Sequence, residues 1–405
     1  MTVQFVQGSP IFTNINKVEK QYNYLTEDIE TEVIIVGGGV TGSILGYYFS
    51  KEGIDSVILE KSRIAHGSTS ITTSLLQYEL DSNLMALTEV EPLEYAINSY
   101  KLGTKALDEI EKFIKEYGNK CNYVKRDTLL YTAKDLEKKE LYEEYKLRKE
   151  NGFNVRFISE EENPFSFNLK AGVYGIEGGA ELDPFKYTHH LLEVACSKGL
   201  RVYENTAVID VKYNKDYVEA ITSYNHKVKG KILVLATGFN TELFTERNFG
   251  VKTYTYNIAT KPLKNIEGWF NNVLIRDNES TYNYFRTTPD NRIIAGGEDT
   301  PFTTNFNPKI ATEKYDILEQ RIKNMFNKNC DIEIEYKYCG AFDSTKDNLG
   351  FIGKDPNNDK LWYGLGYGAN GILFAILGGL MLPKLYKGQS DKDLSYFRVD
   401  RFDKI

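Results

Sequence analysis

Residues 32–42 read EVIIVGGGVTG, a short apolar run followed by a glycine-rich turn. The run from Val33 to Val36 is typical of a strand in a parallel sheet that is covered on both faces. Gly37, Gly39 and Gly42 follow it with the spacing G-x-G-x-x-G, and residues 43–51 have a helical pattern. The first glycine permits a tight turn, the second a close approach of a pyrophosphate, and the third close packing of the helix. The stretch therefore predicts a βαβ unit that binds a dinucleotide.

The next strand supports this prediction. Residues 56–60 read SVILE and end in Glu60, whose carboxylate would accept hydrogen bonds from ribose hydroxyls. A second negative charge on a ribose phosphate would be repelled there, which disfavours NADP. Main-chain N–H groups at the helix N-terminus, around Val40 and Thr41, would face the phosphates.

Three further segments occur in a fixed order along the chain. They are a small-residue loop at 66–76 (HGSTSITTSLL), the Ala-Thr-Gly turn at 236–238, and a stretch from Cys339 to Gly353 followed by Gly366 to Ile372, which opens an apolar helix. The turn ends an apolar predicted strand at 231–236, and an earlier predicted strand contains Val208. Together with the glycine turn they resemble the D-amino-acid-oxidase-like flavoproteins, which include glycine oxidase and monomeric sarcosine oxidase. The resemblance covers nearly the whole chain and implies FAD as the cofactor.

The resemblance also implies which residues bind the FAD. In addition to the residues of the βαβ unit, they are Lys61, Gly67, Ser68, Thr69, Thr72, Thr73, Leu75, Val208, Ala236, Thr237, Gly238, Gly340, Gly368, Ala369, Asn370, Gly371 and Ile372. The last helix would point its positive N-terminal end at the flavin ring and stabilise negative charge on it. The histidine that carries FAD covalently in some relatives falls at Ile71, and the corresponding cysteine falls nearest Gly340, one residue from Cys339. We therefore expect non-covalent FAD.

The chain is expected to be α/β, with a Rossmann-like FAD-binding domain around a central parallel sheet. Tyr- and Thr-rich runs at 253–256 and 282–287 alternate as antiparallel strands do, which predicts a second, α+β substrate domain with a mostly antiparallel sheet. We assign residues 30–90, 170–240 and 340–390 to the FAD-binding domain. Residues 91–169 and 241–339, with surface helices, form the substrate domain, and residues 1–29 form an N-terminal surface arm.

The substrate residues are predicted from the same resemblance and from strand alternation. Glycine oxidase has an arginine that grips the substrate carboxylate where this chain has Phe342. Either another arginine replaces it, with Arg286 as the candidate, or the substrate lacks a nearby carboxylate, because an unpaired buried carboxylate is costly. Tyr282, Tyr284 and Arg286 alternate along one predicted strand and should share a face near the flavin. The alternative is an ordinary sheet face, with Arg286 paired to an acid such as Glu298.

The resemblance implies oxidation of the C–N bond of a small amine or amino acid by hydride transfer to flavin N5, which gives an imine. Oxygen or another acceptor would take the electrons, and Ile294 aligns with the lysine that sarcosine oxidase uses for oxygen. Three alternatives stay open: an FAD dehydrogenase with a non-oxygen acceptor, a non-catalytic flavin-binding protein, favoured by Phe342, and an NAD-dependent dehydrogenase.

Composition narrows the class of protein further. The 405 residues carry a formal net charge of −7, which disfavours nucleic acid as a partner. The four cysteines lie far apart without metal-ligand spacing, so we expect no metal site and a cytoplasmic location. Histidine is scarce, and His66 is expected to make a structural contact. The apolar stretch at 372–385 is shorter than the roughly 20 residues that cross a bilayer, so no integral membrane segment is expected.

Overall fold

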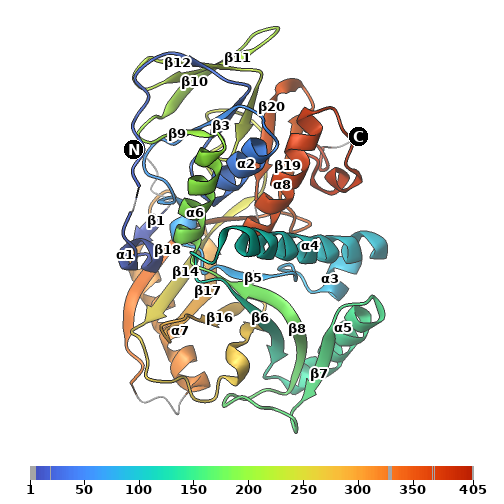
Figure 1. Cartoon of the computed structure of the whole chain (residues 1–405). Coiled ribbons are helices and arrows are strands. Elements are labelled where there is room, and N and C mark those ends of the chain that lie inside the picture. Colours follow the sequence, from blue (N-terminus) through green and yellow to red (C-terminus); the bar gives the residue numbers. More distant parts are fainter. Residues whose placement is uncertain (1–5, 19, 327–330, 367, 369, 404–405) are drawn as a thin grey trace.

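The computed structural model describes residues 6–18, 20–326, 331–366, 368 and 370–403, and of Phe342 only the backbone. In Figure 1 a parallel sheet with helices α2, α6 and α8 lies in the upper half and a ten-stranded sheet with helix α7 in the lower half. The α/β architecture with one parallel and one mostly antiparallel sheet confirms the predicted fold class. Among the described residues, none of the helices has both the length and the apolar character that crossing a membrane requires.

The parallel sheet has the strand order β19-β20-β13-β3-β4-β9, in which only β19 runs antiparallel to its neighbour. Every residue of β3, β4 and β13 is buried, as the continuous apolar runs predicted. The strands are β3 (Val33–Val36), β4 (Ser56–Leu59), β9 (Arg201–Tyr203), β13 (Ile232–Leu235), β19 (Phe351–Asp355) and β20 (Asn358–Leu365).

Three helices pack beside this sheet. Helix α2 (Val40–Lys51) follows the glycine turn and contacts both α6 (Pro184–Ser197) and α8 (Gly371–Tyr386). Asp183 caps α6 by accepting a hydrogen bond from the N–H of Lys186, and Pro184 occupies the first helical position. A four-stranded sheet adjoins the parallel sheet through a contact of β12 with β3. Its strands are β2 (Ile29–Glu30), β10 (Val208–Tyr213), β11 (Val218–Thr222) and β12 (Lys227–Gly230).

The ten-stranded sheet has the order β1-β18-β14-β17-β16-β15-β6-β8-β5, with β7 paired to β8. Helix α7 (Pro308–Met325) packs against β14 and β17, and α5 (Lys138–Glu150) packs against β7 and β8. The strands are β1 (Val6–Gly8), β5 (Leu75–Gln77), β6 (Val124–Thr132), β7 (Val155–Ser159), β8 (Ala171–Glu181), β14 (Val251–Thr260), β15 (Leu274–Asp277), β16 (Asn283–Thr287), β17 (Ile293–Pro301) and β18 (Ile334–Ser344). The remaining α-helices are α1 (Ile11–Ile15), α3 (Leu84–Thr88) and α4 (Leu93–Tyr117).

The N-terminal segment differs from the expected surface arm. Strand β1 pairs with the edge strand β18, and Ile11 and Phe12 of α1 are only 0% and 2% exposed. Edge pairing satisfies the backbone of this segment and carries its apolar side chains into the core. Strand β8 belongs to the ten-stranded sheet although its residues fall in a range assigned to the FAD-binding domain. The domain boundaries stay a prediction.

Candidate active site

A cavity of about 850 Å³ joins the glycine turn after β3 to the ten-stranded sheet. Ligand sites usually measure about 300–1,000 Å³, so this one has room for a large ligand. The predicted cofactor residues that line it are Gly37, Gly39, Val40, Thr41, Glu60, Lys61, Gly67, Ser68, Thr69, Thr72, Thr73, Leu75, Val208, Ala236, Thr237, Gly238, Gly368, Asn370, Gly371 and Ile372. Tyr282 and Tyr284 line it as well.

The glycine end of the cavity is held by short hydrogen bonds. Glu60 accepts from the N–H of Gly38 at 2.7 Å and from the N–H of Ser62 at 2.8 Å. Burial raises the pKa of this carboxyl, and the two N–H groups oppose that shift. Gly42 does not line the cavity; a Cβ there would lie 1.9 Å from the carbonyl oxygen of Gly37. It therefore allows the close approach of α2 to the turn.

The small-residue loop, residues 66–76, is tied to both sheets. The hydroxyl of Thr69 accepts from the N–H of Val40 at the start of α2, at 2.9 Å. From the other side, Arg286 donates its Nε–H to the carbonyl of Thr73 at 2.5 Å, and Asn257 donates to the carbonyl of Ile71 at 3.3 Å. These contacts fix the loop between the glycine turn and the ten-stranded sheet.

The sheet end of the cavity is formed by Asp81, Thr255, Arg276, Tyr282, Tyr284 and Asp299. Tyr282 donates its hydroxyl to Asp81 Oδ1 at 2.5 Å, and the hydroxyls of Tyr284 and Thr255 lie 3.1 Å apart. The two tyrosine rings are 6.0 Å apart, which confirms that they share one face of the strand. Burial, reinforced by the charge of Asp81, raises the pKa of Asp299 to about 6.

Two arginines approach this end in different ways. Arg276 lines the cavity, whereas Arg286 is not among its lining residues and is 2% exposed. The Arg286 guanidinium also donates to the carbonyl of Leu182 at 3.1 Å and lies 3.8 Å from Glu181, not from Glu298. Desolvation lowers the pKa of Arg286. Its contact with a substrate carboxylate therefore stays a prediction, and Arg276 is the arginine placed in the wall at the sheet end.

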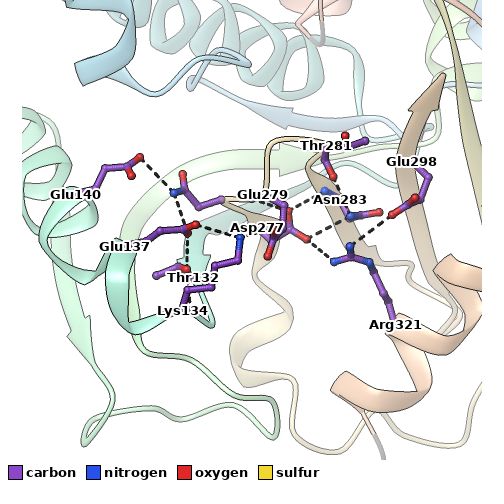
Figure 2. A network of polar contacts seen from close by, with 11 residues as sticks. Thr132, Lys134, Glu137, Glu140, Asp277, Glu279, Thr281, Asn283, Glu298 and Arg321 are labelled. Carbon is purple, nitrogen blue, oxygen red and sulfur yellow. Dashed lines mark hydrogen bonds and ion pairs between the residues drawn. The ribbon is translucent and has the colours of Figure 1, made fainter. Parts of the chain in front are cut away.

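A polar network behind the sheet end positions two of its residues (Figure 2). Arg321 of α7 lies 3.1 Å from Asp277 Oδ2 and 3.5 Å from Glu298 Oε1. Asp277 directly follows Arg276, and Glu298 directly precedes Asp299. One arginine thus clamps the ends of β15 and β17 that carry Arg276 and Asp299 into the cavity.

The sequence interpretation did not include Asp81, Arg276 or Asp299. Their residue types carry no local motif, and their shared feature is a position at or near strand ends. Of the remaining predicted residues, Gly340 pairs with Thr255 and Val6 and does not line the cavity, although Ala341 does. The Phe342 side chain and Ala369 lie outside the described residues.

Comparison with protein families identifies this architecture. The model of the DAO family, described as FAD dependent oxidoreductase, matches residues 32–385. The chain belongs to this family. The predicted family and its oxidoreductase activity are thereby confirmed.

Three similar proteins are distant from this chain in sequence. A Bacillus subtilis protein named for a Rieske 2Fe-2S iron–sulfur centre is 24% identical over 383 residues, which are 93% of this chain and 73% of that protein. The gamma-glutamylputrescine oxidoreductase of Escherichia coli is 22% identical, over 92% of this chain and 87% of that protein. The crystal structure of glycine oxidase from Geobacillus kaustophilus superposes with a TM-score of 0.77 at 19% identity, covering 92% of this chain and 99% of that one.

The polar groups that line this cavity are suited to binding FAD. The hydroxyl oxygens of Thr237 and Ser74, two cavity residues, are buried without a hydrogen-bond partner among the described residues, so a ligand can satisfy them. Helix α8 begins at the cavity with Gly371 and Ile372, and its cap residue Asn370 is fixed by donating to the carbonyl of Glu79 at 2.8 Å. Free N–H groups at this helix end favour negative charge.

Proposed function

We propose that this chain binds FAD non-covalently along the cavity and oxidises the C–N bond of a small amine or amino acid. The observation that carries the proposal is the continuity of the cavity from the glycine turn to the sheet end. A dinucleotide anchored at the turn would extend toward Tyr282, Tyr284 and Asp299, where a substrate could bind. The names of relatives that act on amines or amino acids support the same substrate range.

The chain's own residues would bind and orient the reactants. Glu60 would accept from the ribose, and N–H groups around Gly39 and Thr41 would face the pyrophosphate. FAD, when bound, supplies the acceptor for a hydride from the carbon beside the nitrogen, which leaves an imine. The N–H groups at the start of α8 would stabilise negative charge on the ring, and Tyr282 and Tyr284 would enclose the substrate and exclude water.

Non-covalent binding is supported by the placement of the thiols. Among the described residues that line the cavity, none is a cysteine and His66 is the single histidine. The Nδ1 atom of His66 is 2.8 Å from the carbonyl of Ile64. Cys339 packs in the core with Tyr315 of α7, and burial raises the pKa of its thiol to about 11.

Acid precipitation of the FAD-loaded protein tests non-covalent binding. The yellow colour should stay in the supernatant, and a yellow pellet would contradict non-covalent binding.

Anaerobic flavin reduction tests the oxidation itself. The purified protein, loaded with FAD, should lose its absorbance near the blue flavin band when a substrate amine or amino acid is added under argon. A panel of glycine, sarcosine, proline, D-amino acids and polyamines covers the proposed range. A protein that binds FAD but is bleached by none of them would be a non-catalytic flavoprotein, and one that fails to bind FAD would refute the proposal.

A dehydrogenase is the second candidate. Ile294, which the family resemblance aligns with the oxygen-handling lysine of sarcosine oxidase, is apolar and 0% exposed. No charge at that position would assist electron transfer to oxygen. Reoxidation of the reduced protein by air over minutes, with rapid reoxidation by a quinone, would favour the dehydrogenase. Reoxidation by air within seconds would favour the oxidase.

A further inference from the structure

The sheet end of the cavity carries one arginine, which is held by hydrogen bonds within the protein, and two carboxylates. Arg276 uses three of its five N–H groups within the protein, donating to the carbonyls of Leu80 and Asp81 and to Asn83 Oδ1. These bonds hold the Arg276 guanidinium against the loop at 80–83. The carbonyl dipoles that accept them partly compensate its positive charge. The two carboxylates at the same end, Asp81 and Asp299, outnumber this single cation.

A bulge in the sheet turns Asp299 into the cavity. The register between β14 and β17 shifts between Tyr254 and Tyr256, and Glu298 adopts a left-handed φ of 57°. Glu298 faces α7, where Lys314 Nζ lies 3.0 Å from Glu298 Oε2. Arg321 adds a second contact with Glu298 (Figure 2). The next residue, Asp299, consequently lies on the opposite face of the sheet and lines the cavity.

The carboxylate of Asp299 is incompletely satisfied. Its Oδ1 atom is buried and has no hydrogen-bond partner among the described residues, while Thr255 supplies a hydrogen bond to the side chain. The cations of α7 are engaged with Glu298 and Asp277 on the other face. A buried carboxylate oxygen without a donor is costly, and a ligand N–H would remove that cost.

We propose that Asp299, together with Asp81, binds a protonated amino group of the substrate, so that the preferred substrates are diamines that carry a second, cationic nitrogen and no carboxylate at that end. The nitrogen whose C–N bond is oxidised has to be unprotonated to release the hydride, so the bound ammonium is the other nitrogen. The rings of Tyr282 and Tyr284 line the same end of the cavity, where the Arg276 guanidinium already lies 5.7 Å from the centroid of the Tyr282 ring. This inference rests on the proposed amine oxidation and specifies its substrate class.

Three four-carbon amines test the inference on the FAD-loaded protein, because they differ only in the distal group. 1,4-Diaminobutane carries a distal cation, butylamine a methyl group and 4-aminobutanoate an anion. The efficiency of anaerobic flavin reduction should fall in that order. Asp299→Asn, which keeps the shape of the side chain, should reduce the preference for 1,4-diaminobutane over butylamine by about 10- to 100-fold, as loss of a hydrogen bond to a charged group predicts.

Two further variants make the result specific. Asp81→Asn should also reduce this preference, and it provides the test if the Asp299→Asn variant does not fold. Asp316→Asn, an equal charge change on an exposed side chain of α7, should leave the preference unchanged. Equal or better reduction by 4-aminobutanoate, or an unchanged preference in both cavity variants, would overturn the inference and leave amine oxidation intact.

A binding measurement separates this inference from the activity. tert-Butylammonium keeps three N–H donors but has no hydrogen on the carbon beside its nitrogen, so it is not oxidised, and its binding is read from the perturbation of the flavin spectrum. The parent should bind it more tightly than acetate, and Asp299→Asn should weaken its binding by about 10-fold or more. If no amine reduces the flavin, the proposed function fails, and this titration still decides whether the sheet end binds a cation. Absence of tert-butylammonium binding would overturn the inference.

Discussion

Substitution of Gly42 by alanine should destabilise the protein at one close contact. The added Cβ would lie 1.9 Å from the carbonyl oxygen of Gly37 and 3.1 Å from its carbonyl carbon, both backbone atoms. Overpacking of this kind costs about 1–3 kcal/mol, and a contact this short against backbone belongs at the upper end. Alanine is favoured over glycine in a helix by about 1 kcal/mol, so the net loss of unfolding free energy should be about 2 kcal/mol.

A second glycine supplies the control. A Cβ on Gly378 in α8 would meet its nearest neighbour, Leu45, at an ordinary contact distance of 3.5 Å. Gly378→Ala should therefore gain up to about 1 kcal/mol from helix propensity alone. Urea unfolding of both variants, followed by circular dichroism with and without added FAD, measures the difference. Equal stability gains in Gly42→Ala and Gly378→Ala would refute the close approach of α2 to the glycine turn.

Two further predictions concern buried charges. Cation binding at the sheet end should weaken as pH falls through about 6, because the raised pKa of Asp299 lets this acid become neutral there. Burial is the main cause of that raised pKa; Asp81 and Glu298 raise it further, and Thr255 and Lys314 oppose the shift. The Asp299→Asn variant should show no such dependence in a tert-butylammonium titration. Arg148→Met should lower the unfolding free energy by about 3–5 kcal/mol, because Arg148 is 0% exposed and its loss leaves Glu79 and Glu144 buried without their cation. Arg398→Met, which removes an exposed pair with Asp400, should cost less than about 1 kcal/mol in the same urea measurement, and equal losses in the two variants would contradict the role of burial.

The cofactor side of the molecule could be predicted because its signals are local. A continuous apolar run indicates a strand buried on both faces, and the spacing of Gly37, Gly39 and Gly42 encodes a turn that few other residues permit. Strands β3, β4 and β13 and helix α2 were predicted from such patterns and are present in the structure. The family resemblance linked the segments near 67, 237 and 370, and the described residues of these segments line one cavity.

The sheet end of the cavity depends on contacts between distant parts of the chain. Asp81 meets Tyr282 across 201 positions, and Arg276 reaches the carbonyl of Leu80 across 196 positions. Strand alternation correctly predicted that Tyr282 and Tyr284 share a face, but it could not determine which arginine lines the sheet end of the cavity. That depended on the order of strands in the sheet and on the bulge at Glu298, which places Asp299 on the cavity face.

The sequence by itself thus determined the type of fold and the dinucleotide turn, because backbone conformation and burial periodicity depend on residues close together in the chain. Tertiary structure alone decided which charged groups line the sheet end of the cavity. A charged side chain carries no local mark of its future partner, and its environment is set only when strands hundreds of residues apart pack together.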